Sequence, residues 1–454
     1  MQTSFTPRQL ADPRIEEAES ILRRCVHCGL CTATCPTYLL TGDERDSPRG
    51  RIYLVKDMLE EGRAASREVT HHLDRCLGCL SCMTTCPGGV DYMHLSDLAR
   101  AHIEVTGPRD LPARLQRGLI AAIVPHPMRF RLALFAGKLA RPLAGMFRSI
   151  GLKAIGAMLD LVPPGRPRFS SFRLPGTIPA QGGGRKKRAI LLAGCAQQSL
   201  RPDINDATIR LLTRTGVEVI VARGAGCCGA LSTHMGREAE GREQAARNIA
   251  AWTTAMGDHP LDAIVINASG CGTTVKDYGH MFARDEKLWK QAAHIGGMAK
   301  DVTELLASHD LGPPKRWSSL RVAYHGACSL THGQRVTAEP RLLLQKAGFA
   351  VIEVPEGHIC CGSAGTYNML QPELSRELRD RKIANIERIR PEVIATGNIG
   401  CITQLQQATD IPVVHTVELL DWAYGGPCPR GLEALEDRVR EVPDQQIKTV
   451  VAAR

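Results

Sequence analysis

Eight of the seventeen cysteines fall in two short runs near the N-terminus. Residues 25–36 read Cys-Val-His-Cys-Gly-Leu-Cys-Thr-Ala-Thr-Cys-Pro, and residues 76–87 read Cys-Leu-Gly-Cys-Leu-Ser-Cys-Met-Thr-Thr-Cys-Pro. Thiolates are soft ligands. Three of them at this spacing can bind three corners of an iron–sulfur cubane while the loop amides point at its sulfides. The two runs therefore predict two [4Fe–4S] clusters.

Both runs match the pattern C-x₂-C-x₂-C-x₃-C-P of bacterial two-cluster ferredoxins, in which the fourth cysteine binds the other cluster. This predicts one cluster held by Cys25, Cys28, Cys31 and Cys86, and another held by Cys76, Cys79, Cys82 and Cys35. Structural zinc also uses four cysteines, but its sites usually pair two C-x-x-C halves. Two complete runs ending in proline favour iron–sulfur clusters over zinc.

The segment between the two runs has helical signals. Ser47-Pro48 is a typical helix start, apolar residues recur at helical spacing over Arg51–Glu61, and a second short helix is expected over Arg67–Asp74. This segment resembles the α-helical ferredoxin module of iron–sulfur subunits in respiratory dehydrogenases. We expect that module to occupy residues 1–105, followed by a helical segment and a linker rich in Pro, Gly and basic residues over 106–184.

The remaining cysteines reveal a tandem duplication. Each copy has a cysteine, a Cys-Cys-Gly 32 residues later and a final lone cysteine. These are Cys195, Cys227, Cys228 and Cys271 in the first copy, and Cys328, Cys360, Cys361 and Cys401 in the second. The cysteines follow short apolar runs, and helical stretches such as Ala245–Met256 and Glu373–Ile389 lie between them. This alternation predicts parallel βαβ units, whose strand ends would gather four thiols at one sheet edge.

Each copy resembles the cysteine-rich CCG domain, and we place the two copies at residues 185–312 and 313–429, with a tail over 430–454. The family pattern ends in C-x-x-C, but Ala268 and Asn398 replace the first of those cysteines here. Members with five cysteines hold unusual clusters that perform disulfide chemistry. The four remaining thiols leave two alternatives, a further iron–sulfur or metal centre or structural thiols.

Several weaker motifs in the sequence do not indicate a further function. Gly224–Gly229 spells G-x-G-x-x-G, but the second copy lacks its first two glycines, so we expect no nucleotide or flavin in this chain. The RKKR run at 185–188 is expected to be a solvated linker end. Histidines near the cysteines are expected to be hydrogen-bonding neighbours, not ligands: His27, His325, His332 and His358. No nucleophile elbow is found, so no catalytic residue is assigned, and Cys428 has no predicted role.

Composition limits the remaining classes. The longest apolar runs fall far short of the roughly 18 residues of a membrane span, and the N-terminus has no apolar core of a signal peptide, so a cytoplasmic protein is expected. The basic, apolar segment 125–161 is expected to pack on its neighbours more readily than on a membrane. The formal charge of +10 is compatible with nucleic acid binding, but two clusters of about −2 each would lower it to about +6, and four to about +2. We therefore expect no nucleic acid partner.

Taken together, a helical two-cluster ferredoxin module followed by two α/β CCG domains with parallel sheets makes a multidomain α plus α/β chain. This architecture resembles the iron–sulfur subunits of bacterial glycolate oxidase. Stretches that carry the resemblance are residues 24–31, 47–52, 268–272 and 324–330. It implies electron transfer from an FAD-containing subunit that oxidises glycolate to glyoxylate towards a membrane quinone, at the inner face of the cell membrane. The alternatives are a related lactate or glycerol-3-phosphate dehydrogenase subunit, or a heterodisulfide-reductase-like thiol enzyme acting at the CCG domains.

Overall fold

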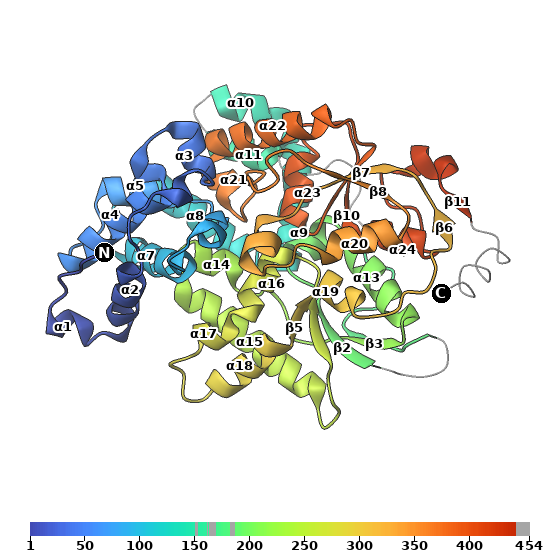
Figure 1. Ribbon diagram of the computed structural model, residues 1–454, viewed down its shortest axis with the longest axis horizontal. Helices are drawn as coiled ribbons and strands as arrows, with labels where there is room; N and C mark the ends of the chain where they lie inside the picture. Colours follow the sequence, from blue (N-terminus) through green and yellow to red (C-terminus); the bar gives the residue numbers. More distant parts are fainter. Residues whose placement is uncertain (150–152, 161, 163–168, 182–186, 442–454) are drawn as a thin grey trace.

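The computed structural model describes residues 1–149, 153–160, 162, 169–181 and 187–441. A helical N-terminal module packs beside two α/β domains, and further helices lie between them in sequence (Figure 1). The module is drawn in blue at one end, the first α/β domain in green and yellow, and the second in orange and red. The predicted fold class is confirmed.

The N-terminal module is built from short helices around one apolar core. Its α-helices are α1 (Pro7–Leu10), α2 (Pro13–Arg23), α3 (Pro36–Thr41), α4 (Pro48–Glu60), α5 (Arg67–Asp74), α6 (Ser81–Thr85) and α7 (Tyr92–Thr106). The predicted start of α4 is confirmed, because the Ser47 side chain accepts a hydrogen bond from the Gly50 amide at 3.0 Å. One face of α4 supplies Ile52, Val55 and Met58 to the buried core.

The first α/β domain contains a five-stranded sheet in the order β1-β3-β2-β4-β5. Four strands are parallel, β2 (Lys187–Leu192), β3 (Val217–Val221), β4 (Ala263–Ile266) and β5 (Ala299–Asp301). Helices cover the sheet: α12 (Ala196–Leu200), α13 (Asp203–Arg214), α14 (Ala230–His234), α15 (Glu238–Met256), α16 (Ser269–Lys276), α17 (Tyr278–Met281), α18 (Trp289–Met298) and α19 (Val302–Ala307). Both faces of β2 and β4 are buried, which explains their unbroken apolar sequences.

Part of the predicted linker belongs to this domain. The segment Gly176–Ile178 forms β1, which pairs antiparallel with β3, and Ser170 and Ser171 donate hydrogen bonds to Asp206. Lys187 and Arg188 begin β2, and Arg188 forms an ion pair with Glu218 at 3.1 Å. The expectation of a solvated linker end is therefore wrong for Lys187 and Arg188. Both residues lie in a strand that pairs with β3, and the carboxylate of Glu218 is the partner of Arg188. Residues 163–168 and 182–186 lie outside the described residues.

The second α/β domain repeats the same topology. Its sheet has the order β10-β9-β7-β8, all parallel, from β7 (Arg321–Tyr324), β8 (Ala350–Glu353), β9 (Val393–Thr396) and β10 (Val413–His415). Its helical elements are η4 (Ser329–Gly333), α20 (Glu339–Lys346), α21 (Tyr367–Leu370), α22 (Pro372–Arg388), α23 (Ile399–Leu405) and α24 (Thr416–Ala423). This order matches β5-β4-β2-β3 of the first domain, so the predicted duplication is confirmed.

The two α/β domains share one apolar core. Residues of both sheets belong to the same buried group, and α13 of the first domain packs on α24 of the second. Arg210 and Arg214 of α13 both pair with the buried carboxylate of Asp421, at 2.6 and 2.8 Å. A short ribbon of β6 (Arg316–Trp317) and β11 (Arg440–Glu441) lies beyond them. The duplicated domains therefore form one packed unit.

The connecting segment forms α8 (Leu111–Ile123), α9 (Pro127–Ala140), α10 (Ala144–Ser149) and α11 (Lys153–Asp160). Its inner side packs on neighbouring elements, with Ile120 and Ala121 on Met235, and Met158, from the segment expected to pack on its neighbours, joins the same apolar group. Its outer side leaves large apolar side chains exposed, namely Leu115, Leu119, Met128, Leu132, Phe135 and Leu139. Among the described residues, no single helix is long and apolar enough to cross a membrane, and one bent pair, Leu111–Ile123 with Pro127–Phe147, meets the length and composition requirement only jointly.

Candidate iron–sulfur and thiol centres

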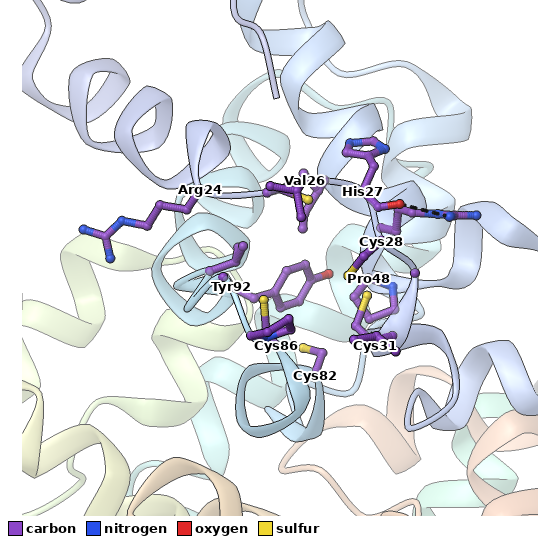
Figure 2. Close-up of a pocket in the computed structure, with 17 residues that line it drawn as sticks. Arg24, Val26, His27, Cys28, Cys31, Pro48, Cys82, Cys86 and Tyr92 are labelled. Atoms are coloured by element: carbon purple, nitrogen blue, oxygen red, sulfur yellow. Dashed lines mark hydrogen bonds between the residues drawn. The ribbon is translucent and has the colours of Figure 1, made fainter.

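The thiols of the N-terminal module gather around two pockets. The first, called the outer pocket, has a volume of about 490 Å³ and is lined by Cys25, Cys28, Cys31 and Cys86, with Cys82 at its edge. Figure 2 shows the side chains of Cys28, Cys31, Cys82 and Cys86 around the ring of Tyr92. Cys28 is exposed and Cys31 and Cys86 are half-buried, so this pocket lies close to the surface.

The second, called the inner pocket, has a volume of about 310 Å³ and is lined by Cys35, Cys76, Cys79 and Cys82. Cys35, Cys76 and Cys82 are buried. Each pocket therefore contains three cysteines of one run and the last cysteine of the other run, and Cys82 lines both pockets. The linings include the two sets of four cysteines that the sequence predicts, and four thiols are a ligand set that fits a [4Fe–4S] cluster.

The loops that carry the thiols have left-handed residues at equivalent positions. His27 and Gly29 have φ of 57° and 81° in the first run, and Gly78 and Leu80 both have φ of 63° in the second. The alternation of left-handed residues with thiols curls each loop around its pocket. The Gly78 amide, for example, points at the Cys76 sulfur at 3.4 Å.

The two pockets are adjacent and share three lining residues. Cys82, Pro48 and Tyr92 line both of them. Pro48 lies between the pockets because Ser47 caps α4 and Pro48 is its first residue. The first turn of α4 lies against η2 (Glu44–Asp46), and only a glycine fits at position 50, because an added Cβ would meet the Glu44 carbonyl oxygen at 2.1 Å. The helix start predicted from Ser47-Pro48 thus sets the spacing between the two centres.

Buried positive charge surrounds the inner pocket. Arg51 is 1% exposed, its Nε donates to the His72 carbonyl oxygen at 2.7 Å, and its Nη1 lies 3.9 Å from the Cys35 sulfur. Arg100, also buried, donates to the Cys76 carbonyl oxygen at 2.7 Å. Burial opposes ionisation of Cys76, but Arg51 and Arg100 outweigh it and lower the pKa of that thiol. The positive charges of Arg51 and Arg100 therefore favour a negatively charged group in the inner pocket.

The outer pocket has a different environment. Burial raises the pKa of the Cys31 thiol to about 11, and Arg49, which lines the pocket, donates from Nη1 to the His27 carbonyl oxygen at 3.3 Å. Large apolar side chains are exposed around Cys28, namely Val26 at 72%, Leu30 at 54% and Tyr53 at 58%. We call these three residues the apolar rim.

The structure also brings together the thiols of each α/β domain. In the first domain the Cys227 sulfur accepts hydrogen bonds from the thiols of Cys195 and Cys228. These hydrogen bonds lower the pKa of Cys227 well below its usual value. The chain of contacts continues from Cys228 to Cys271. In the second domain Cys328, Cys360, Cys361 and Cys401 form the same chain of contacts. The thiols follow the carboxyl ends of parallel strands, as the predicted sheet requires.

The histidines behave differently from one another. His332 shares a hydrogen bond with Thr84 of α6 at 2.8 Å, which confirms its predicted role as a neighbour. His325 is buried, and neither of its ring nitrogens has a hydrogen-bond partner within the described part of the chain. The predicted hydrogen-bonding role of His325 is therefore wrong. Burial, and then the charge of Lys382, lower the pKa of His325 to about 3, so its imidazole is neutral.

Asn398, one of the two positions where the CCG pattern is broken, has a structural role. Asn398 caps α23, because its Oδ1 accepts from the Gly400 amide at 2.9 Å, and its Nδ2 donates to the Ser269 hydroxyl at 3.0 Å. The side chain therefore links the two α/β domains where the family pattern has a fifth thiol. Sequence reasoning missed Arg51, Tyr92 and Lys382, since nothing in their local sequence marks them as neighbours of thiols.

Comparison with known proteins agrees with this geometry. The 4Fe-4S dicluster domain family matches residues 21–90, and the cysteine-rich domain family matches residues 189–276 and 322–406. The glycolate oxidase iron-sulfur subunit of Escherichia coli is 41% identical over 93% of this chain and 99% of its own length. The chain belongs to the family of glycolate oxidase iron–sulfur subunits.

Other relatives of this family member are more distant. A probable glycolate oxidase iron-sulfur subunit of Bacillus subtilis is 31% identical over 91% of this chain and 96% of its own length. Lactate utilization protein A of Oceanobacillus iheyensis is 27% identical over 52% of this chain and 96% of its own length. A solved structure of a hypothetical protein from Helicobacter pylori shares the fold, with a TM-score of 0.52 at 10% identity over 95% of this chain and 76% of that one. The chain is thus an iron–sulfur subunit of the oxidoreductase type.

Proposed function

We propose that this chain carries electrons for a 2-hydroxy-acid oxidase whose substrate is glycolate and whose flavin lies in another subunit. The observation that carries the proposal is the pair of thiol-lined pockets that share Pro48, Cys82 and Tyr92 in their linings. In this proposal Cys25, Cys28, Cys31 and Cys86 hold one [4Fe–4S] cluster, and Cys35, Cys76, Cys79 and Cys82 hold the other. When bound, each cluster supplies a one-electron carrier.

The chain's own residues give the two sites different tasks. The outer pocket is near the surface, and its apolar rim offers a contact for an FAD-containing subunit. The inner pocket is buried beside Arg51 and Arg100, whose charges stabilise a more negative centre. Hydrogen bonds to the Cys76 sulfur from the Gly78 amide and the Tyr92 hydroxyl act in the same direction. In this proposal a flavin subunit would dock at the apolar rim beside the outer site, and the positive charges of Arg51 and Arg100 would favour the reduced state at the inner site.

The exposed apolar side of α8 and α9 is the proposed contact with the acceptor. Leu132, Phe135 and Leu139 are exposed there, and the basic side chains of Arg129, Lys138 and Arg141 are exposed on the same helical segment. An apolar face bordered by cations is suited to the surface of an anionic membrane, where a quinone dissolves. In this proposal the subunit is peripheral at the inner face of the cell membrane.

The test is anaerobic purification of the chain with and without the flavoprotein encoded for the same complex. We expect about eight irons per chain, and glycolate should reduce the clusters only when the flavoprotein is present. Val26→Asp with Leu30→Glu should weaken that reduction without loss of iron. Zinc in place of iron would contradict the proposal, as would cluster reduction by lactate or glycerol 3-phosphate in preference to glycolate.

A further inference from the structure

The second α/β domain contains a buried set of metal-ligating side chains that do not line either N-terminal pocket. A ring nitrogen of His325 and the sulfurs of Cys361 and Cys401 all lie within 4.8 Å of one another, and all three residues are buried. Thiolate and imidazole are the usual ligands of tetrahedral zinc-class ions. We propose that these three side chains bind one divalent transition-metal ion. The inference is independent of the proposed electron-transfer function.

His325 is buried without a hydrogen-bond partner for its imidazole in the described part of the chain. It is 1% exposed, and neither ring nitrogen has a hydrogen-bond partner among the residues that the structure describes. Buried polar groups nearly always have a partner, because a group that has left water without one is strongly destabilising. An ion placed between His325, Cys361 and Cys401 gives one ring nitrogen that partner.

The first α/β domain provides an internal comparison. His325 lies three residues before Cys328, and the equivalent residue, three before Cys195, is Leu192. Lys382 lies 21 residues after Cys361, and the residue 21 after Cys228 is Ile249. Leu192 and Ile249 both pack in the apolar core of the first domain. Two polar residues thus face the thiols in the second copy where the first copy has apolar ones.

The charge of Lys382 points to an anionic site. Its side chain is 1% exposed, its Nζ donates to the Glu356 carbonyl oxygen at 2.7 Å, and the thiols of Cys328, Cys360 and Cys361 lie close to its ammonium group. A buried ammonium needs a counter-charge. A divalent ion displaces one proton to solvent from each thiol that it binds. Cys361 and Cys401 balance the ion, and Cys360, which contacts Cys361, is positioned to make the set anionic beside Lys382.

The spacing of the thiols suits a single ion. Cys360, Cys361 and Cys401 are in direct contact along the chain of thiols, so an ion bound to one sulfur lies within reach of the next. The outer pocket is different, since its thiols line a cavity instead of forming a chain of direct contacts. A cubane needs space between its four ligands, whereas a single zinc-class ion binds each sulfur at about 2.3 Å.

The test is metal analysis of the full-length protein after anaerobic purification, combined with EPR of its clusters. Wild-type protein should hold one equivalent of zinc or another divalent transition metal beyond the cluster iron. His325→Leu, which installs the residue of the first copy, and Cys401→Ser should each lose that equivalent and keep the cluster signals. The matched control Cys271→Ser, at the equivalent position of the first domain, should lose no metal.

Several outcomes would overturn the proposal. Retention of all metal in His325→Leu would exclude His325 as a ligand, and equal loss in Cys271→Ser would remove the distinction between the domains. Loss of four irons in His325→Leu would indicate a cluster instead of one ion. X-ray absorption at the edge of the extra metal in wild-type protein avoids dependence on variant folding. We expect a mixed shell of sulfur at about 2.3 Å and nitrogen at about 2.0–2.1 Å, and an all-sulfur shell would contradict it.

Discussion

Cys79 of the N-terminal module and Cys328 of the second α/β domain pack against the same buried apolar group, although they come from opposite halves of the chain. This group contains Leu77, Ile359 and Cys360. Burial, and then the neighbouring Cys328 thiol, raise the pKa of Cys79 well above its usual value. The inner pocket and the thiols of the second α/β domain are therefore electrostatic neighbours.

Replacement of Cys328 should consequently change the electrostatic environment of the inner pocket. We expect Cys328→Ala to shift the EPR spectrum assigned to the inner cluster and to leave the outer one unchanged. The matched control is Cys195→Ala, at the equivalent position of the first α/β domain, which should shift neither signal. Identical spectra for Cys328→Ala and wild type would show that the two sites are uncoupled.

Arg51 should set the reduction potential of the inner cluster. Its guanidinium is fully buried beside Cys35 and Cys76, where its charge favours the more negative, reduced state. Arg51→Met should therefore lower the inner potential by on the order of 100 mV, for an interaction of a few kcal/mol at an effective dielectric of about 20. Asp46 keeps its ion pair with Arg75 and its hydrogen bond with His72 in this variant, so the fold should survive.

Redox titration followed by EPR measures the effect at Arg51. Arg49→Met is the control, because the half-exposed Arg49 lies beside the outer pocket, and its loss should change the inner potential little. An unchanged inner potential in Arg51→Met would mean that other groups set the charge balance there.

His94 should make the junction between the N-terminal module and the first α/β domain sensitive to pH. Its ring bonds Asp91 at 2.6 Å and Asp277 at 3.0 Å. Burial opposes the shift, but the two carboxylates raise the pKa of His94 to about 10. A histidine whose pKa is raised by folding stabilises the folded state. This stabilisation is complete at a pH below the unfolded pKa of about 6.5, and it is lost as the pH rises through about 10.

His94→Gln should therefore lower the free energy of unfolding most at pH about 6, by on the order of 2–4 kcal/mol, and progressively less as the pH approaches 10. Denaturant unfolding at several pH values checks this. Asp277→Asn should reproduce the same trend, because it removes one of the two carboxylates. A deficit that grows with rising pH would contradict a protonated His94.

Local patterns in the sequence were sufficient for much of this architecture. The thiol spacing, the Ser47-Pro48 helix start and the repeated Cys-Cys-Gly each act within a few residues, so the elements they predict agree with the structure. Contacts between distant segments could not be predicted in this way. The three-residue strand β1 forms in a Pro- and Gly-rich segment only because the edge of β3 is available to it. The isolated imidazole of His325 and the neighbouring Lys382 likewise depend on how β7 and α22 meet.

The ligand role of Cys35 decides whether the two cysteine runs exchange their last ligands. The decisive measurement is the EPR difference spectrum of Cys35→Ser, compared with those of Cys28→Ser in the outer pocket and Cys79→Ser in the inner pocket. Exchange predicts that Cys35→Ser loses the same signal as Cys79→Ser and keeps the signal that Cys28→Ser loses. Loss of the Cys28→Ser signal instead would mean that each run binds its own cluster and would contradict the account.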